Sequence, residues 1–421
     1  KRKQMAMDKT HFPAKWTYAS IFFAVVMLPW DTSLSNAGII AIIPFSIISF
    51  IILGIAGNIL RTSSFYLITT IALFLPVLIG TIYSNDLEGA IFQVSKAIFY
   101  LLVPLMLLRK DLQREKLMKW MTIAMVIGMS SSMVYLLSRN LHTFLNSNLP
   151  WDKIFAYSFT GKKFLEPIPE MHPVYYGSYL LFFLVLLIGK ANPIQKWLKW
   201  ILVLLALVTV IFINSRIIFL IFLILGILFW FRLPNIKLKL YFGIGSLLSL
   251  ALLAWALQST YVFNKVTKGT QWELSEQIGT PNLSKDQLAD TRMSRWKVSL
   301  DIIWDKPIFG HGTGASRGIL VETYRKNQMT TSVDQQYDSH NQYLGYAIDY
   351  GIFGLCFLLW YLIGNALESV RRKDVLLGSF TLIIFIICLT ENYLIRNMGI
   401  NFVAIMGAVL LINRFTEYPS R

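Results

Sequence analysis

The sequence predicts an all-α polytopic membrane protein with about twelve membrane-spanning helices. Of its 421 residues, 55% are hydrophobic and only 15% are charged, which is far more apolar than a soluble domain. The apolar residues fall in runs of about twenty, the length that an α-helix needs to cross the hydrocarbon core of a bilayer. Lys and Arg gather between these runs, where they mark the side of the membrane on which each connector lies.

The apolar runs predict the position of each helix to within several residues. The predicted spans are 16–33, 36–58, 64–83, 90–108, 117–138, 172–189, 196–213, 215–231, 239–258, 341–367, 375–391 and 397–414. A tight turn around Asn214 is expected between the seventh and eighth spans. The first run is expected to stay in the protein as an anchor, because many spans follow it and no small-residue cleavage site does.

Basic residues alternate from one connector to the next, which predicts the sidedness of the chain. Arg109 and Lys110 follow the fourth span and Arg372 follows the tenth, whereas the connectors 31–36 and 84–89 carry neither Lys nor Arg. Since Lys and Arg in short loops stay on the cytoplasmic side, both termini are expected there. The net charge of +16 is therefore interpreted as a topology signal and not as a nucleic-acid-binding surface.

Two long polar segments, 139–171 and 259–339, are then expected on the outer side. The chain divides into three parts: nine helices in 1–258, a large outward loop in 259–339, and three further helices in 340–421. The large loop contains ten basic and nine acidic residues, so it is nearly neutral and is not a simple basic membrane tether. A loop of that length without low-complexity sequence is usually functional or folded.

Part of this loop, 290–305, has helical periodicity that ends before Pro307. Trp296, Leu300 and Ile303 recur at helical spacing and predict the apolar face. The opposite, solvated face is predicted from Lys297, Asp301 and Asp305.

Neither a metal nor a cofactor is expected from the sequence. Cys356 and Cys388 lie inside predicted spans and form no CxxC motif, so no disulfide framework or cysteine metal site is indicated. The outward loops show no His and carboxylate cluster with metal-ligand spacing. The glycine-rich segment 310–314, GHGTG, lacks a preceding strand and a following Lys-Ser/Thr, which favours a loop over a phosphate cradle.

His340 is the main candidate for chemistry, because the polar stretch 335–341 runs directly into an apolar span. Asp338 or Ser339 is expected to cap that helix, with His340 and Asn341 in its first turn at the membrane boundary. An imidazole next to a carboxylate can accept a proton near neutral pH. The alternative is that His340 only caps the helix and contacts lipid headgroups.

Two arginines lie where a charge is costly and needs an anion. Arg292 precedes Trp296 by four residues and so shares its apolar face, and Arg216 opens a span that is otherwise apolar. A guanidinium in such a place binds an anionic ligand, or else forms a salt bridge or a lipid-phosphate contact.

Three further residues are secondary candidates for lining the same site. Arg396 lies near the outer boundary, where Glu391 is its expected partner. Lys96 lies within two turns of the outer end of its span and either extends to water or points into the cavity. His172 begins a span from the outside and is also explained as the start of a helix with an aromatic belt.

Four stretches together resemble the superfamily of bacterial O-antigen ligases and polymerases. They are NSR at 214–216, TRMSRWKVSLDIIWDKPIFGHGTG at 291–314, SHNQYLGYAIDYGIFGL at 339–355 and LTENYLIRNMGINF at 389–402. The topology, with a large outward loop between late helices, resembles that superfamily over the whole chain. The motifs are specific only in the second half.

This resemblance implies a class C glycosyltransferase-like fold in the bacterial inner membrane with a periplasmic active site. It implies an O-antigen ligase that moves a glycan from undecaprenyl diphosphate to the lipid A–core without metal or nucleotide. Attack from the face opposite the diphosphate would invert the anomeric centre. His340 matches the residue thought to act as base, and Arg216 and Arg292 match arginines that hold the diphosphate. His172, Lys96, Asn341 and Arg396 are possible lining residues, and the partners are the carrier-linked donor, the acceptor and membrane lipids.

Three alternatives stay open at the level of sequence. A polymerase of the same superfamily joins two carrier-linked glycans, and a protein-directed oligosaccharyltransferase uses a polypeptide acceptor. A glycolipid transporter also has many spans and intramembrane charges, although here the charges gather at the outer boundary and the two halves show no repeat.

Overall fold

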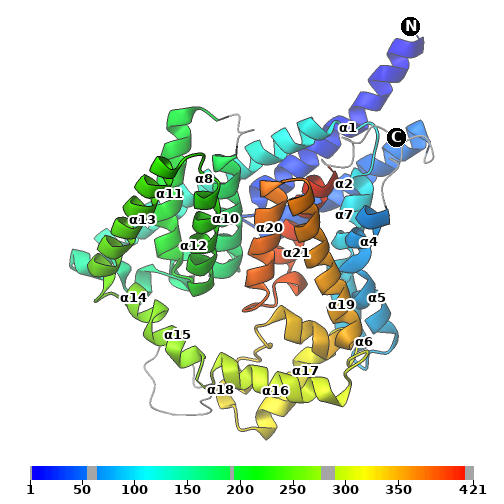
Figure 1. Ribbon diagram of the computed structural model, residues 1–421. Coiled ribbons are helices and arrows are strands. Elements are labelled where there is room, and N and C mark those ends of the chain that lie inside the picture. Colours follow the sequence, from blue (N-terminus) through cyan, green and yellow to red (C-terminus); the bar gives the residue numbers. More distant parts are fainter. Residues whose placement is uncertain (1, 55–63, 190–193, 276–289, 413–421) are drawn as a thin grey trace.

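A computed structural model describes residues 2–54, 64–189, 194–275 and 290–412, and within these ranges the chain is helical with no β-strand (Figure 1). Every predicted span that lies in these ranges contains helix. The first helices are α1 (Arg2–Met27), α2 (Thr32–Leu53), α4 (Ser64–Ala72), α5 (Leu75–Ile82), α6 (Leu87–Ala97), α7 (Phe99–Leu107) and α8 (Arg114–Leu145).

Short 3-10 turns and one short helix connect α8 to the middle of the chain. These are η1 (Trp151–Phe155), η2 (Tyr157–Phe159) and α9 (Lys162–Leu165). Four long helices follow, namely α10 (Pro173–Ile188), α11 (Lys196–Ile213), α12 (Arg216–Phe231) and α13 (Ile236–Leu257). The expected turn between α11 and α12 is confirmed, because Asn214 ends α11 in the left-handed conformation with φ 46°.

The last helices complete the bundle. They are α19 (Gln342–Arg371), α20 (Val375–Ile387), η3 (Tyr393–Ile395) and α21 (Asn397–Ile412). α21 is buried over its length from Gly399 and packs against α7, α2, α8 and α20, so it is the centre of the bundle. A helix that is apolar on all sides belongs in such a position.

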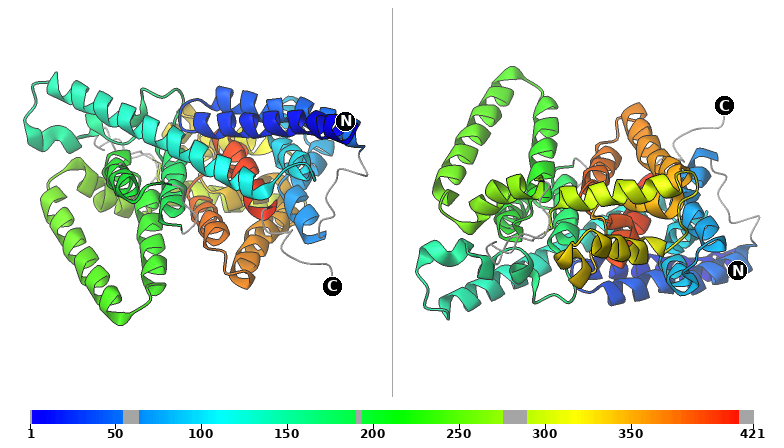
Figure 2. Two further views of the ribbon diagram at one scale, coloured as in Figure 1. Left: turned by 90° about the horizontal axis from the view of Figure 1, so that it is seen from above. Right: turned by 90° about the horizontal axis from the view of Figure 1, so that it is seen from below.

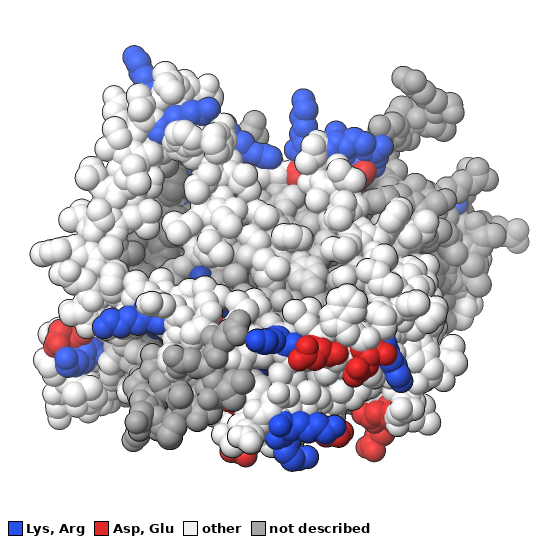
Figure 3. Space-filling model, turned by 60° about the horizontal axis from the view of Figure 1, so that its bottom comes forward, with Lys and Arg blue, Asp and Glu red and all other residues white. Residues whose placement is uncertain are grey.

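The surface of the bundle has the character of a membrane protein. Six described helices are long and apolar enough to cross a bilayer by length and composition, and five apolar helices are shorter. Along α13 only the last residue, Leu257, is buried among the described side chains, and Leu247, Leu252 and Trp255 are exposed. In Figure 3 the charged side chains gather at two edges of the visible face, and the band between them is almost uncharged. This distribution supports a multi-pass membrane protein.

The outward loop predicted at 259–339 contains five described helices at one end of the bundle. They are α14 (Tyr261–Val266), α15 (Lys268–Glu273), α16 (Arg292–Asp305), α17 (Ala315–Lys326) and α18 (Thr330–Asp334). Seen from below, α16, α17 and α18 lie across the ends of the later bundle helices (Figure 2). A small hydrophobic core joins these helices to α19, and it contains Val298, Ile302, Leu320, Tyr324, Met329 and, from α19, Ile348.

The predicted helix at 290–305 is confirmed, and the residues of its predicted solvated face, Lys297, Asp301 and Asp305, are exposed. The predicted apolar face, however, is not the most buried side of the helix. Val298 and Ile302 are buried against α17, while Leu300 is 49% exposed. Arg295, one residue from the predicted face, is only 1% exposed. Helical periodicity identifies an apolar side, but an apolar side can contact either protein or lipid, and the pattern does not distinguish them.

The segment 306–314, including the GHGTG stretch, is a loop that packs into a break of α19. At this break Gly351 has φ 61° and ψ −156°, a backbone region that is essentially restricted to glycine. The N–H groups of Ile352 and Phe353 donate to the carbonyl groups of Pro307 and Ile308, at 2.8 and 3.1 Å. The loop therefore supplies backbone partners that an unbroken helix would supply itself.

Candidate functional site

His340 lies immediately before α19, at the end of the bundle that α16–α18 cover. Its backbone is left-handed, with φ 46°, and its N–H donates to Asp338 Oδ1 at 2.9 Å. Asn341 is the N-cap, because its Oδ1 accepts the N–H groups of Tyr343 and Leu344. The expectation that Asp338 or Ser339 caps the helix is therefore wrong, as is the placement of His340 and Asn341 in the first turn. The positive φ turns the chain one residue before the cap.

The imidazole of His340 faces two carboxylates. Its Nδ1 lies 3.4 Å from Glu391 Oε2 and 3.4 Å from Asp338 Oδ1. The ring of Tyr337 packs edge-on beside it, with the ring centroids 5.4 Å apart. A neutral imidazole whose Nδ1–H donates to a carboxylate presents Nε2 as its proton acceptor. The side chain of His340 is 18% exposed, so its neighbours fix the ring while part of it stays accessible to solvent.

Arg292 joins the same cluster through Glu391. Its Nη2 lies 3.5 Å from Glu391 Oε1, and its buried Nε has no hydrogen-bond partner among the described residues. Burial by itself would raise the pKa of Glu391, but the charges of His340, His172 and Arg292 outweigh it and lower that pKa below its ordinary value. Glu391 is therefore an ionised carboxylate that bridges the imidazole and the guanidinium.

Arg216 is placed beside this cluster by a second carboxylate, Glu273, which was not among the predicted site residues. Arg216 Nη2 lies 3.2 Å from Glu273 Oε1, and the backbone N–H of Arg292 donates to Glu273 Oε2 at 3.1 Å. Arg216 is the first residue of α12, where the helix dipole disfavours a cation. An anion at this position compensates that cost.

Arg295 is the other site residue that sequence reasoning missed. Its guanidinium lies 3.8 Å from Glu273 Oε2 and 4.8 Å from the centre of the Tyr337 ring. The sequence could have identified Arg295, because it follows Arg292 by three residues on a predicted helix and residues at that spacing lie on the same face. Burial tends to raise the pKa of Glu273, but Arg292, Arg295 and Arg216 outweigh it and lower that pKa.

Arg396 forms an ion pair with Asp338, its Nη2 lying 3.3 Å from Oδ2. The expected pairing of Arg396 with Glu391 is therefore wrong, because the fold brings Arg292 and His340 to Glu391 instead. The prediction rested only on nearness in sequence, and the 3-10 turn Tyr393–Ile395 separates the two residues.

The remaining candidates lie at the margin of the site. His172 precedes α10, where its Nδ1 accepts the N–H of Val174 at 3.4 Å. Burial lowers the pKa of His172, Glu391 opposes that effect, and the nearby charge of His340 adds to it. Lys96 lies over the Phe92 ring at 4.2 Å and is near enough to Arg396 for their charges to interact.

The predicted aromatic belt after His172 is wrong for three residues. Tyr175, Tyr176 and Tyr179 are at most 1% exposed and therefore face the bundle interior and not the lipid boundary. Tyr175 stacks on Tyr393, with ring centroids 4.9 Å apart, which ties α10 to the segment that carries Glu391.

Among the residues that the structure describes, no group of three or more His, Cys, Asp and Glu side chains is arranged to hold a metal ion. Cys356 and Cys388 are both free. The site instead gathers one imidazole with arginines and carboxylates at an end of the bundle. Such a site can accept a proton at His340 and bind an anion through guanidinium groups.

The fold and this cluster define a class: an α-helical, multi-pass membrane protein with a basic, histidine-containing site beside a helical loop. Residues 201–359 match the model of the protein family described as O-antigen ligase, and this match supports membership of the chain in the O-antigen ligase superfamily. The matched region contains Arg216, Glu273, Arg292 and His340, whereas Glu391 lies beyond it. No curated protein matches the chain.

Proposed function

We propose that this protein is an O-antigen ligase, which transfers a glycan from undecaprenyl diphosphate to a hydroxyl group of the lipid A–core on the periplasmic face. At the superfamily level the matched domain implies a ligase or polymerase activity of the glycosyltransferase kind. The single observation that carries the proposal is the contact network in which Glu391 joins His340 to Arg292. It combines a proton acceptor and an anion-binding group within one cluster.

His340 has the role of general base in this proposal. The acceptor hydroxyl must lose its proton as its oxygen attacks the anomeric carbon, and Nε2 takes up that proton while Glu391 stabilises the imidazolium that forms. The bond from the anomeric carbon to the diphosphate oxygen breaks with its electron pair, so undecaprenyl diphosphate leaves as an anion. Attack from the opposite face inverts the anomeric centre.

Arg216 and Arg292 have the role of diphosphate ligands. A guanidinium carries five N–H donors in a planar fork, and one carboxylate contact does not use them all. Arg292 retains a buried Nε without a partner among the described residues, and both arginine side chains are 23% exposed. Donors therefore remain for phosphate oxygens while Glu391 and Glu273 hold the arginines in place.

The test is reconstitution of the purified protein with carrier-linked glycan and lipid A–core, with an excess of EDTA in a parallel reaction. A ligase yields glycosylated core in both reactions, because the proposed chemistry uses a histidine base and arginine ligands. Longer carrier-linked chains would indicate a polymerase, a need for polypeptide would indicate a protein-directed enzyme, and no new bond would indicate a transporter. A strict requirement for magnesium or manganese would contradict the metal-independent mechanism.

A further inference from the structure

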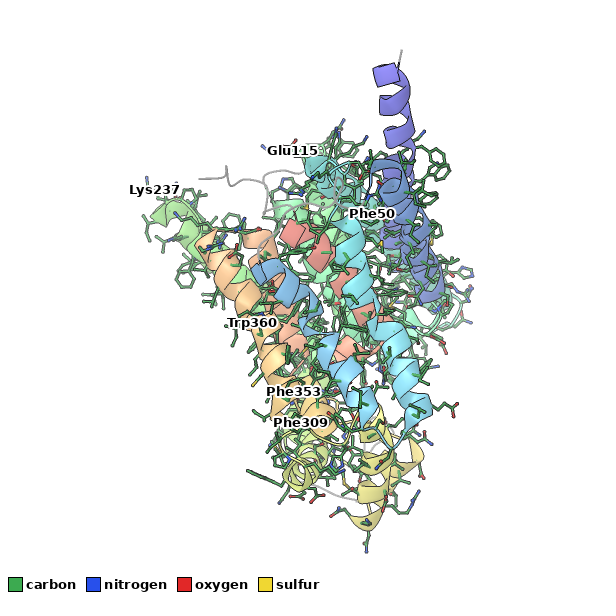
Figure 4. The ribbon with its side chains drawn as sticks, turned by 90° about the vertical axis from the view of Figure 1, so that its right-hand side faces the viewer. Phe50, Glu115, Lys237, Phe309, Phe353 and Trp360 are labelled. Carbon is green, nitrogen blue, oxygen red and sulfur yellow. The ribbon has the colours of Figure 1, made fainter. Side chains whose placement is uncertain are left out.

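A cavity of about 960 Å³ lies around the first turns of α8. Figure 4 labels Glu115 of this region at one end of the molecule and Phe309 near the other, where α16–α18 cover the His340 site. The cavity is therefore at the end of the bundle remote from His340. Its basic lining residues are Lys110, Arg114, Lys116 and Lys119, and its apolar ones include Leu112, Trp120 and Ile123.

The charge of this cavity is strongly positive. Glu115 is the single acid in its lining. Asp111 is adjacent in sequence, but its carboxylate is already in an ion pair with the fully buried Arg109 and so does not offset the lysines. Arg114 Nη1 is buried and has no hydrogen-bond partner among the described residues. A buried guanidinium nitrogen without an acceptor indicates room for an anionic ligand.

The start of α8 adds a second source of positive potential. Gln113, the N-cap of this 32-residue helix, makes no side-chain capping bond. The first N–H groups of a helix have no intrahelical acceptor, and the helix dipole favours an anion beside them. Phosphate groups bind at such helix starts, and here four basic side chains surround one.

An apolar surface continues from this basic cavity along α8. Lys116, Trp120, Ile123 and Ile127 are spaced by three or four residues and so lie on one face of the helix. Trp120 is 38% exposed and Ile127 is 45% exposed, as expected for a surface that faces lipid. Lys116 lies over the Tyr18 ring at 5.1 Å, which positions its ammonium group beside the cavity.

We propose that this cavity binds the phosphate headgroup of an anionic phospholipid, whose acyl chains lie along Trp120, Ile123 and Ile127. Basic pockets at the ends of membrane helices bind anionic lipid headgroups in this way. A free phosphate would share the headgroup chemistry but would make no use of the apolar face. The continuity of the cavity with that face therefore favours the lipid.

The test uses the full chain in detergent, titrated with dioleoylphosphatidylglycerol and observed by native mass spectrometry. The double variant Lys116→Gln/Lys119→Gln should bind this lipid about twenty-five-fold more weakly, since each cation near a headgroup contributes about fivefold. The matched control is Lys237→Gln/Lys239→Gln, which removes the same charge outside the cavity lining and should leave the affinity unchanged. Thermal unfolding and gel filtration confirm that each variant is folded.

Two further arms separate the lipid from free phosphate. Trp120→Ala should weaken binding of the lipid but not of soluble glycerol phosphate, and neutral dioleoylphosphatidylcholine should bind weakly to every variant. Equal losses in the two lysine pairs would overturn the proposal, as would equal binding of the neutral lipid. Displacement of the lipid by glycerol phosphate at the same concentration would show a site for free phosphate and would also overturn it.

Discussion

At the scale of the residue, both the backbone conformation of His340 and the contacts of its ring determine its position. Only a few per cent of residues other than glycine adopt a positive φ, and His340 does so with its N–H bonded to Asp338. The carboxylates of Asp338 and Glu391 then face one ring nitrogen from two sides. This arrangement holds the ring in one orientation, which a general base requires.

His340→Ala should lose most turnover but still bind the carrier-linked donor. General-base assistance contributes about a hundred- to ten-thousand-fold to rate and little to affinity for the ground state. The measurement is donor affinity in nanodiscs beside the ligation rate. His142→Ala is the matched control, because His142 is an exposed histidine that contacts Asn146, outside the His340 site. Full activity of the His340→Ala variant would remove His340 from the mechanism.

Arg216→Ala and Arg292→Ala should weaken donor binding together with turnover. Each removes a charge-assisted contact to the diphosphate that exists both in the bound donor and in the transition state. Substitution by Lys should rescue only in part, because an ammonium group lacks the planar fork. Arg325→Ala, on the exposed side of α17, is the control and should change neither quantity. Donor affinity that is unchanged in both site variants would refute the assignment.

Acid should destabilise the native protein partly through Glu273. Its pKa is lowered in the folded state, so the folded protein binds fewer protons than the unfolded chain below the ordinary glutamate pKa of about 4.3. The stabilisation from Glu273 is thus complete above that pH and is lost as the pH falls through the lower, folded-state value. Glu273→Gln should reduce stability at neutral pH and weaken this acid dependence.

Thermal unfolding between about pH 3 and pH 7 measures this effect on the variant and on the original protein. Asp301→Asn, at an exposed position of α16, is the control. If the Glu273→Gln variant lost stability in acid as steeply as the original protein, the three arginines would not be the partners that hold this carboxylate ionised.

At the scale of the element, the break in α19 connects the segment 306–316 to the bundle. Besides the two bonds from Ile352 and Phe353, the N–H groups of His311 and Gly312 donate to the carbonyl groups of Ile348 and Asp349. Asp349 also accepts the N–H of Ser316 at 2.8 Å, near the start of α17. Asp349 therefore binds the start of α17, so one polar side chain and one backbone break join the loop to α19.

Gly351→Ala should destabilise the protein by roughly 3 kcal/mol, because φ 61° with ψ −156° is strained for any residue with a side chain. A Cβ at this position would also overlap the carbonyl group of Ile308. The matched control is Gly318→Ala within α17, where a Cβ would meet nothing within 4 Å and alanine favours helix. Thermal unfolding should separate the two variants, and equal stability would contradict the role of the break.

At the scale of the whole molecule, charge separates the two ends of the bundle. One end carries the basic α8 cavity, and the other carries the His340 site, where carboxylates and arginines are paired. Single cysteines at Ser84 and Lys162 should react from outside intact cells with a membrane-impermeant thiol reagent, and those at Lys116 and Arg372 should not.

Lys285 is also expected to react from outside, although it lies outside the described residues. Cysteines introduced at Lys116 and Arg372 become reactive only after the membrane is permeabilised, which confirms that they are present and accessible. Labelling at Arg372 in intact cells would place the His340 site on the cytoplasmic side and would contradict the proposed periplasmic transfer.

The sequence by itself determined which segments form apolar helices and which residues are candidates for the site. Runs of about twenty apolar residues and basic connectors are local features, and each helix forms largely according to its own composition. The turn at Asn214 and the helix at 290–305 were predicted correctly on such grounds, and the resemblance to the O-antigen ligase superfamily, which rested on motifs, is supported by the family match over 201–359. His340 was chosen as a titratable imidazole where a polar stretch runs into an apolar span. Arg216 and Arg292 were chosen because a charge that opens an apolar span or lies on an apolar helix face is costly.

Only the tertiary structure decided how those residues are paired. Glu391 and His340 are 51 residues apart, and Glu273 and Arg216 are 57 residues apart, so no local periodicity indicates that they meet. The cap at Asn341, the buried face of α16 and the pairing of the glycine-rich loop with α19 depend in the same way on contacts between distant segments. Local hydrophobicity specifies helices, whereas packing between helices specifies which polar groups share a site.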